Sequence, residues 1–409
     1  MTQLARVLIA LLLASISVAQ GKNLLFYGSS YTYYSWGYGV PELVREIATE
    51  AGHPTPTIVA ALVGGSTLQF HATDPAQMAV ISNALPAGQT WDNVVLQAGT
   101  LEATDNGGYT AAQFRSNSVA ITANVRAHSP TARTVMYQTW ASSWGDPNYP
   151  LGWPTPLQMH EEIRGNYQLA TSDIEATFGV GSAANAAVGD GLALLQWDPS
   201  YYEVDMNHPT PRMILLAGMC IYTSIYGETV CAIAPDFQGS SPLVAMLAAQ
   251  GLGANEWNQM AGIADRCADR ALRAYPGSGD YLLLETAAGN GPKDACPRKA
   301  MTIGTNVSMQ VRSLNGIYDN APCWMLVDVF PTGSPPGAAA NFPEIQVNLG
   351  RMSILGTSMG LANPLSFALQ MPFSWPGTSV LVQGLAWQPS PATGSSLFTT
   401  TDAHEFAFF

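Results

Sequence analysis

The chain has 409 residues, of which 47% are hydrophobic and only 11% are charged, and its net charge at pH 7 is −13. Lysine occurs only at Lys22, Lys293 and Lys299. This composition argues against a nucleic-acid partner, which requires a basic surface to neutralise phosphates. The length favours two domains, and the acidic, charge-poor composition favours a neutral substrate.

The first residues have the pattern of a secretion signal. Arg6 precedes an apolar run from Val7 to Ala14, and Ser17-Val18-Ala19 is a small-x-small cleavage sequence. Residues 1–19 are therefore predicted to be a signal peptide that is cut before Gln20. A retained anchor helix is the alternative, but the apolar run is shorter than the roughly 20 residues that a membrane span needs. The mature protein is predicted to be secreted, either to the periplasm or outside the cell.

A buried strand followed by a tight turn is predicted next. Leu24–Tyr27 is an apolar run that ends at Gly28, and two serines, Ser29 and Ser30, follow it. A continuous apolar run fits a parallel strand covered on both faces, and open α/β sheets bind ligands at the carboxyl ends of such strands. Because residues 39–50 are predicted to form the next helix, a serine in this turn could act as a nucleophile. Ordinary loop composition is the alternative.

Strands and helices alternate through the following part of the chain. Strands are predicted over 57–62, 93–97, 134–138 and 184–188, and helices over 75–85, 111–128, 157–174, 211–226 and 255–274. This alternation predicts an α/β fold with a doubly wound parallel sheet. The segment 141–155 is rich in proline and glycine and is predicted to be a functional loop.

Beyond Pro276 the composition changes to short strand-forming runs separated by Gly, Pro, Ser and Asn. Strands are predicted over 280–285, 324–329, 345–349 and 379–385. The pattern predicts an all-β, sandwich-like accessory domain over residues 277–409, after an α/β domain over 20–276. The sequence Gly356-Thr357-Ser358-Met359-Gly360 matches the nucleophile elbow of α/β-hydrolases. We interpret it as accidental because no strand-turn-helix unit surrounds it.

The cysteines do not have the spacing of metal ligands. None is in a Cys-x-x-Cys pair, and no group of His and carboxylates has zinc-ligand spacing, so neither a metal nor a cofactor is expected. In a secreted chain the five cysteines allow two disulfides and one remaining thiol, with the pairing open.

Asp205 and His208 lie three residues apart in a predicted turn just before a helix. Parallel strands bring their carboxyl ends to one edge of a sheet, so Ser30, Gly65 and this turn are predicted to converge there. Acyl transfer from an ester needs a nucleophile, a base, a group that orients the base and donors for the oxyanion. Ser29 or Ser30 is the candidate nucleophile, His208 the predicted general base and acid, and Asp205 the predicted orienting carboxylate. A helix cap beside a surface histidine is the alternative for this turn.

These stretches together resemble the four sequence blocks of the SGNH (GDSL-type) hydrolase family. The matching segments are Gly28–Thr32, Gly65, Val94–Glu102 and Asp205–His208. The resemblance covers about residues 22–230 and implies a flavodoxin-like three-layer sandwich. It also implies that Ser30 is the nucleophile, because Ser29 stands where the family usually has Asp or Asn.

The third block departs from the family pattern. Gly-x-Asn-Asp appears here as Gly99-Thr100-Leu101-Glu102, so the asparagine that donates to the oxyanion is missing. The predicted donors are the backbone N–H groups of Ser30 and Gly65 and the side-chain amide of Gln97, which resembles a Val-Val-Leu-Gln variant of an SGNH subgroup. Loss of one donor typically costs about 2.7 to 4 kcal/mol of transition-state stabilisation. Either Gln97 replaces the asparagine or the enzyme is slow.

Aromatic residues gather near the predicted site. Tyr31, Trp140 and Trp144 are predicted to contact the substrate, with core packing as the alternative for about half of the aromatic residues nearby. The other members of this group are Tyr33, Tyr34, Trp36, Tyr38, Tyr149 and Trp153. His71 is predicted to line the pocket, and a hydrogen-bonded structural histidine is the alternative.

The resemblance implies a secreted, metal-independent serine esterase that removes O-acyl groups, first of all acetyl, with an acylated polysaccharide as the expected partner. Two alternatives stay open. One is an esterase for lipids or polyesters. The other is a carbohydrate- or surface-binding protein that keeps the scaffold without turnover. The sequence leaves the oligomeric state open and predicts no membrane span after signal cleavage.

Overall fold

The computed structural model describes residues 20–33, 39–99, 101–147, 149–302, 304–337, 339, 341–370 and 375–408. The predicted signal peptide lies outside these residues. A five-stranded sheet with the order β2-β1-β3-β4-β5 forms the centre of the first region, and all its strand pairs are parallel. Its strands are β1 (Asn23–Gly28), β2 (Thr57–Leu62), β3 (Asn93–Gln97), β4 (Arg133–Tyr137) and β5 (Ala183–Ala186). This order is that of flavodoxin-like doubly wound folds.

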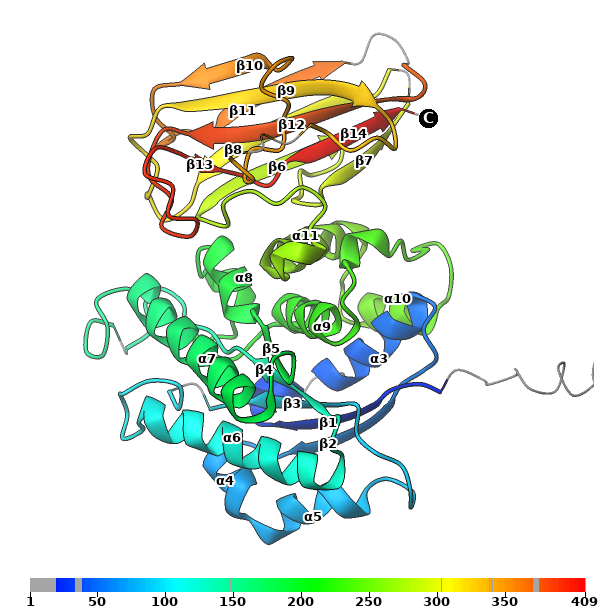
Figure 1. The fold of residues 1–409 in the computed structure, drawn as a ribbon, viewed down its shortest axis with the longest axis vertical. Coiled ribbons are helices and arrows are strands. Elements are labelled where there is room, and N and C mark those ends of the chain that lie inside the picture. The colour runs from blue at the N-terminus through cyan, green and yellow to red at the C-terminus, as the bar shows by residue number, and fades with distance from the viewer. Residues whose placement is uncertain are drawn as a thin grey trace, which may run out of the picture.

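Two layers of helices cover the two faces of this sheet (Figure 1). One layer contains α4 (Leu68–Thr73), α5 (Pro75–Asn83), α6 (Ala111–His128) and α7 (Pro156–Phe178). The other contains α3 (Val40–Glu50), α8 (Val188–Leu194), α9 (Pro211–Tyr226), α10 (Pro242–Ala249) and α11 (Ala254–Cys267). Every residue of β1 and β3 is buried, as expected for strands covered on both sides. The predicted three-layer α/β sandwich is confirmed.

The sequence pattern missed four of the α-helices described in the first region, namely α2 (Ser30–Tyr33), α4, α8 and α10. α4 is only 6 residues long, α8 contains two glycines, and α10 has no polar face that would reveal helical spacing. Side-chain caps define α4 and α10 in the structure, because Thr67 accepts from the N–H of Phe70 and Ser241 from that of Val244. A short helix with a good cap leaves too few periodic positions to be detected.

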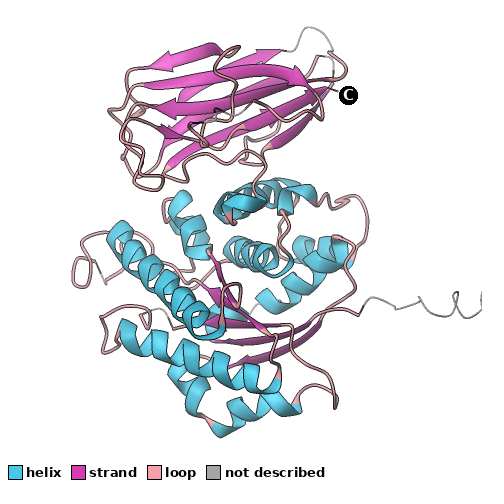
Figure 2. Cartoon of the chain, viewed as in Figure 1, coloured by secondary structure: helices cyan, strands magenta, loops and turns pink. Residues whose placement is uncertain are grey.

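The second region consists almost entirely of strands (Figure 2). Its larger sheet has six strands in the order β10-β9-β12-β14-β7, with β13 paired to β12, and its smaller sheet has the order β11-β8-β6. The strands are β6 (Leu282–Ala288), β7 (Arg298–Met301), β8 (Asn306–Ser313), β9 (Cys323–Pro331), β10 (Ser353–Ser358), β11 (Leu365–Gln370), β12 (Thr378–Ala386), β13 (Thr399–Thr400) and β14 (His404–Phe408). An apolar cluster that contains Val311, Met325 and Val382 draws on both sheets. The predicted β-sandwich fold is therefore confirmed.

One strand prediction in this region is wrong. Residues 345–349 form no strand. Ile345 and Val347 are nevertheless buried, in a cluster with Leu326 and Leu381 of the larger sheet. The alternating apolar pattern therefore reflects a loop that covers a sheet face, which periodicity alone cannot distinguish from a strand.

The Gly356–Gly360 sequence falls at the end of β10 with no helix after it, as expected for an accidental match.

The two regions pack against each other. Leu283 and Leu314 of the β region belong to the same apolar cluster as the α/β core, and the Tyr281 hydroxyl donates to Glu161 at 2.7 Å. A disulfide joins Cys231 to Cys296. The change from helical to strand structure falls between the short helix η3 (Arg270–Leu272) and β6. Two further short helices are η1 (Pro199–Tyr201) and η2 (Val230–Ala232).

The described residues contain one disulfide where two were allowed. Cys220, Cys267 and Cys323 are free thiols.

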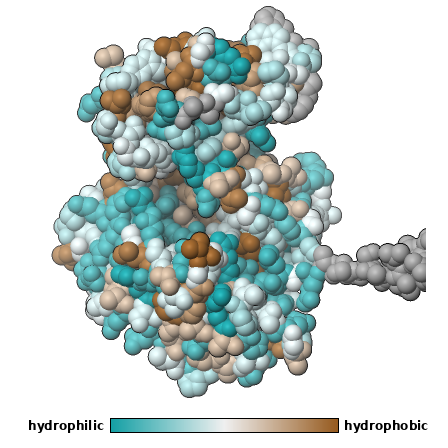
Figure 3. Space-filling model, viewed as in Figure 1, coloured by the Kyte–Doolittle hydropathy of each residue, from teal (hydrophilic) through white to brown (hydrophobic). Residues whose placement is uncertain are grey.

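On the face shown in Figure 3, apolar groups occur in scattered patches between polar ones, over both regions. None of the described helices combines the length and the apolar character required to span a bilayer.

Candidate active site

A pocket of about 320 Å³ lies at the carboxyl end of the parallel sheet. Ser30 begins the short helix α2 (Ser30–Tyr33) two residues after the end of β1, and the turns after β2 and β3 provide other parts of the wall. The lining residues are Ser29, Ser30, Tyr31, Gly65, Ser66, Thr67, Gly99, Leu101, Tyr109, Asn207 and His208. The sheet therefore brings distant parts of the chain into one concave site, as parallel topology requires.

Ser30, His208 and Asp205 form a continuous chain of polar contacts. The Ser30 hydroxyl lies 2.9 Å from Nε2 of His208, and Nδ1 of His208 lies 2.5 Å from Oδ2 of Asp205. The other carboxylate oxygen of Asp205 accepts the backbone N–H groups of Asn207 and His208, at 3.1 and 2.9 Å. The imidazole is thus held from one side while its other nitrogen faces the serine, which is the geometry of a nucleophile with its base and orienter.

The turn also sets the charge of the carboxylate. Burial opposes ionisation of Asp205, but hydrogen bonds from the backbone and ring of His208 and from the N–H of Asn207 outweigh it, so the pKa of Asp205 is lowered. Met206 lies in the left-handed region with φ of 61°, which few residues other than glycine adopt. This conformation lets the chain turn tightly enough for one carboxylate to contact the residues two and three positions ahead.

The turn is fixed from outside by the loop after β4. The backbone N–H of Ser143 donates to the carbonyl of Met206 at 2.9 Å, and the indole N–H of Trp140 donates to the carbonyl of Asn207 at 3.1 Å. The Tyr31 ring stacks on Trp140 with 4.7 Å between centroids, and its hydroxyl donates to the side-chain oxygen of Asn207. Tyr31 also meets the ring of His208 edge-on, at 5.3 Å. The loop that was predicted to be functional therefore holds the turn that carries His208.

These contacts correct the prediction for Trp140. Its side chain is fully buried and does not line the pocket, so Trp140 holds the turn that carries Asp205 and His208 and is not placed to contact a substrate. Tyr31 does line the pocket, although its hydroxyl is occupied by Asn207. Trp144 is 51% exposed and lies outside the pocket lining, and its contact with substrate stays a prediction. Tyr34, Trp36 and Tyr38 lie outside the described residues.

The prediction that Gln97 donates to the oxyanion is wrong. Gln97 is buried below the serine turn and does not line the pocket. Its side-chain oxygen accepts the N–H and hydroxyl of Ser29, at 2.7 and 3.0 Å, and the hydroxyl of Thr32 at 3.0 Å, while its amide nitrogen donates to the carbonyl of Ala98. Both the oxygen and the nitrogen of this amide therefore have hydrogen-bond partners inside the protein. Gln97 therefore holds the nucleophile turn in place.

The two backbone donors predicted for the oxyanion remain compatible with the site. Ser30 and Gly65 both line the pocket, and Gly65 has φ of 70°, with no atom within 4 Å of the position that a Cβ would take. Leu101, at the position of the missing asparagine, also lines the pocket but has no polar group. The roles of the two N–H groups stay predictions.

His71 does not line the pocket as predicted. Its ring is fully buried, with Nε2 at 2.9 Å from the Ser66 hydroxyl and 3.1 Å from the carbonyl of Gly28, and Nδ1 at 3.1 Å from Gln77. Burial lowers the pKa of His71, against the hydrogen bonds that raise it. The alternative interpretation, a structural histidine, is the one that fits: His71 links the end of β1 to the glycine turn.

Sequence reasoning assigned no role to Glu102, which connects two turns of the site. Its carboxylate accepts the backbone N–H groups of Leu68 and Gly99, at 2.8 and 3.0 Å, and that of Gln69 at 3.3 Å. Burial raises the pKa of Glu102, while these N–H groups act to lower it. The signal was available: Glu102 stands where the family block has its aspartate.

No group of three or more His, Cys, Asp or Glu side chains in the described ranges is arranged to hold a metal ion.

Comparisons with known proteins give matches in structure only. No protein-family model matches the chain, and no curated protein matches it. A candidate SGNH hydrolase from Slackia heliotrinireducens is similar with 19% identity and a TM-score of 0.39, over 50% of this chain and 100% of that one. A psychrotrophic esterase from Pseudoalteromonas sp. shares 13% identity with a TM-score of 0.37, over 50% and 97% of the two chains. A carbohydrate esterase family 3 protein from Talaromyces cellulolyticus shares 15% identity with a TM-score of 0.37, over 50% and 97%.

Proposed function

We propose that the chain is a secreted serine esterase that removes O-acyl groups through Ser30, His208 and Asp205. The observation that carries the proposal is the continuous contact from the serine hydroxyl through the imidazole to the carboxylate, at 2.9 and 2.5 Å. A serine hydroxyl is a weak nucleophile on its own, and an adjacent, oriented base is what activates it.

The reaction proceeds in two halves. His208 accepts the proton of Ser30 at Nε2 while the serine oxygen bonds to the acyl carbon, and the carbonyl oxygen becomes an oxyanion. The backbone N–H groups of Ser30 and Gly65 stabilise this charge. His208 then protonates the leaving alcohol oxygen, and the acyl group remains on Ser30. Water repeats the sequence, with His208 as base and then as acid, and releases the carboxylic acid. Asp205 holds the tautomer and stabilises the imidazolium throughout.

The proposed substrate is an acetylated carbohydrate. A pocket of about 320 Å³ with Leu101 and Tyr109 in its wall suits a short acyl group better than a long chain. The disulfide between Cys231 and Cys296 supports an oxidising compartment, consistent with the proposed signal peptide.

Two adjacent serines offer a matched test. The Ser30→Ala variant should lose turnover of p-nitrophenyl acetate by about 10⁴-fold or more, as expected when a catalytic nucleophile is removed. Ser29→Ala removes only a hydroxyl that bonds to Gln97, so a loss of at most about tenfold is expected. Equal turnover in wild type and Ser30→Ala would refute the assignment. A panel of acetylated xylan and longer acyl esters then separates a carbohydrate esterase from a lipid or polyester esterase.

A second candidate is a binding protein that keeps the scaffold without turnover. The observation that favours it is Leu101, which puts an apolar side chain in the pocket at the position of the family's oxyanion asparagine. A folded wild-type protein that binds acetylated xylan and hydrolyses none of the panel would support this candidate.

A further inference from the structure

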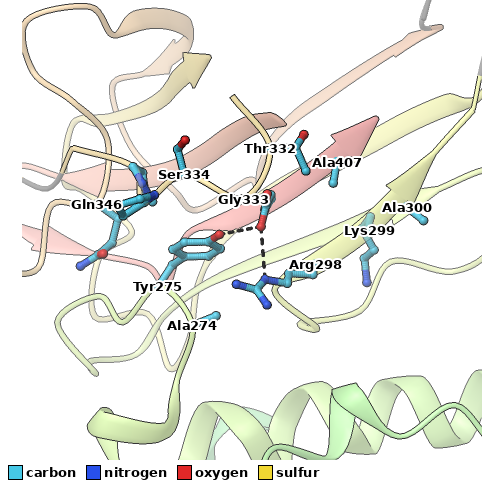
Figure 4. A pocket seen from close by; sticks show the side chains of 13 residues that line it. Ala274, Tyr275, Arg298, Lys299, Ala300, Thr332, Gly333, Ser334, Gln346 and Ala407 are labelled. Atoms are coloured by element: carbon cyan, nitrogen blue, oxygen red, sulfur yellow. Dashed lines mark hydrogen bonds and ion pairs between the residues drawn. The ribbon is translucent and has the colours of Figure 1, made fainter. Parts of the chain in front are cut away.

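A second cavity, larger than the Ser30 pocket, lies in the β region. Its volume is about 780 Å³, compared with about 320 Å³ for the pocket that contains Ser30. The strands β7 and β14, the loop 332–336 after β9 and Tyr275 from the connecting segment form its walls (Figure 4). Cavities of 300 to 1,000 Å³ are typical of sites for small molecules.

A buried carboxylate organises one side of this cavity. Glu405 is only 5% exposed. One of its oxygens accepts the hydroxyl of Tyr275 at 2.5 Å and pairs with Nε of Arg298 at 3.2 Å, and the other accepts the hydroxyl of Ser379 at 2.6 Å. A buried charge is stable only when it is paired and hydrogen-bonded, as it is here. Glu405 thus fixes the position of Arg298 instead of binding a ligand itself.

Arg298 presents the accessible positive charge of the cavity. Its side chain is 68% exposed, and the ion pair with Glu405 uses the Nε edge of the guanidinium. The guanidinium also lies over the Tyr275 ring, 5.6 Å from its centroid, and Figure 4 shows the two side chains beside each other. Lys299 lines the same cavity, but Asp294 pairs with its ammonium group. Tyr275 is a second hydrogen-bond partner of this guanidinium, and the exposed part of the side chain remains accessible to a ligand.

Neutral polar groups complete the cavity wall. Gln346 lines the cavity, and its side-chain nitrogen donates to the carbonyls of Pro276 and Pro343, at 3.0 and 2.7 Å. Both N–H groups of this amide are therefore used, and its oxygen is the group that can accept a hydrogen bond. Ser334, on the loop after β9, adds a hydroxyl across from Tyr275 and Arg298 (Figure 4). A planar cation, an amide acceptor and a hydroxyl around one cavity are the partners that a polyhydroxylated ligand needs.

We propose that this cavity binds a carboxylated saccharide, a chain that contains uronate residues, with Arg298 paired to the carboxylate and Gln346 and Ser334 bonded to sugar hydroxyls. The guanidinium fork matches the geometry of a carboxylate, and charge-assisted hydrogen bonds of this kind are the strong ones. Glu405 pairs with the Nε edge of Arg298, so a ligand carboxylate would bind the remaining, exposed part of the guanidinium, which a neutral sugar could bind only through weaker, neutral hydrogen bonds. Because none of these residues belongs to the Ser30 pocket, the site does not depend on the proposed esterase reaction.

Calorimetric titration of the full-length Ser30→Ala variant tests this site without turnover. Unesterified trigalacturonate is the probe, and a neutral galactose trisaccharide is its matched control. We expect the acidic sugar to bind at least tenfold more tightly than the neutral one. In the same background, Arg298→Gln should weaken binding of trigalacturonate by about 10- to 100-fold, the value of a charge-assisted hydrogen bond.

Arg351→Gln is the control variant, because Arg351 is a partly exposed arginine of the same region that pairs with Asp328 outside the cavity. It should bind the probe as the parent does. Ser334→Ala lies away from the Glu405 ion pair and should weaken binding about threefold, so the test stands even if Arg298→Gln folds poorly. The proposal is overturned by an absence of binding, by equal binding of both sugars, or by equal effects of the Arg298 and Arg351 variants.

The two proposals fail separately. Arg298→Gln made in the wild-type chain should hydrolyse p-nitrophenyl acetate within about twofold of the wild-type rate, since none of the cavity residues lines the Ser30 pocket. Loss of trigalacturonate binding with intact hydrolysis would assign the cavity to recognition alone. An inactive wild-type chain that still binds the probe would refute the esterase and leave the saccharide site intact.

Discussion

The Ser30 pocket and the cavity of the β region both pair a carboxylate with a basic side chain, but the more exposed partner is the carboxylate in the first and the basic group in the second. In the Ser30 pocket, the carboxylate of Asp205 is the more exposed partner, at 46%, and His208 is 26% exposed. In the β region, the side chain of Glu405 is only 7% exposed and that of Arg298 is 68% exposed. The first arrangement directs a proton acceptor inward to a nucleophile, and the second directs a fixed charge outward. This difference is consistent with the catalytic role that we propose for the first site and with the recognition role that we propose for the second.

The two regions also assemble their sites differently. Ser30 and His208, which are 178 residues apart, meet because the carboxyl ends of parallel strands share one edge. Tyr275 and Glu405 meet because the segment that connects the two regions passes beside β14. In that sheet β14 and β7 are parallel, and the other strand pairs are antiparallel. Only the convergence of parallel strand ends can be predicted from a sequence, because it follows from the alternation of strands and helices.

The largest effect in the comparison is expected for Asp205. Asp205→Asn should lower kcat on p-nitrophenyl acetate by about 10²- to 10⁴-fold, because an amide cannot hold the same tautomer or stabilise the imidazolium. Trigalacturonate binding in the β region should not change. Since the pKa of Asp205 is lowered in the folded protein, the carboxylate stays ionised at pH 7 and the assay is valid there. A loss of less than tenfold would mean that the carboxylate does not orient the base.

The next largest effect is a loss of stability, expected when the disulfide between the two regions is removed. Replacing both Cys231 and Cys296 by Ser opens a loop closed over a sequence separation of 65 residues, which should lower the free energy of unfolding by about 4 kcal/mol. Urea titration measures the change. Cys267→Ser, which alters a free thiol on α11, should cost only about 1 kcal/mol. Equal costs for the two variants would show that the disulfide does not stabilise the folded chain.

Leu101 offers a gain of activity in the Ser30 pocket. Leu101→Asn restores a donor where the family pattern has one, and should raise kcat by about tenfold, less than the 10²- to 10³-fold typical of a complete oxyanion donor. Stopped-time assays at saturating p-nitrophenyl acetate give this value. If kcat is unchanged or falls, the backbone N–H groups already complete the oxyanion site or the new amide points elsewhere.

The smallest effect concerns His160, which is fully buried near the junction. Burial, aided by the nearby Arg164, lowers the pKa of His160 to about 3. The unfolded chain, with an ordinary pKa of about 6.5, binds this proton more readily, so stability is lost as the pH falls below that value. Between pH 6.5 and 5.5, His160→Gln should lose about 1 kcal/mol less than the wild type. Parallel curves for the two proteins would contradict this.

The parts of the structure that could be predicted are those governed by repeating patterns. Buried strands such as β1 and β3, the parallel sheet and the nearness of Ser30 to His208 follow from apolar runs and from one topological rule. The direction of a side chain does not follow in this way. Gln97 ends a strand at the edge of the site, yet its amide turns inward to Ser29 and Ala98.

The same limit explains the other corrections. Trp140 and His71 follow strand ends that were predicted to border the site, but their rings hold turns in place. Which turn a ring contacts depends on its packing partners, and only the three-dimensional structure reveals these. Glu405 and Arg298 carried no recognisable motif at all. They form a site because β14 and β7 lie side by side, and that pairing has no signature in the sequence.

Covalent labelling of the wild-type chain by a fluorophosphonate, followed by peptide mass spectrometry, tests the central claim most directly. The account predicts one phosphonylated residue, Ser30, with labelling that is lost in Ser30→Ala and kept in Ser29→Ala. A folded protein that takes up no label, or that carries it on Ser29 or any other residue, would contradict the account.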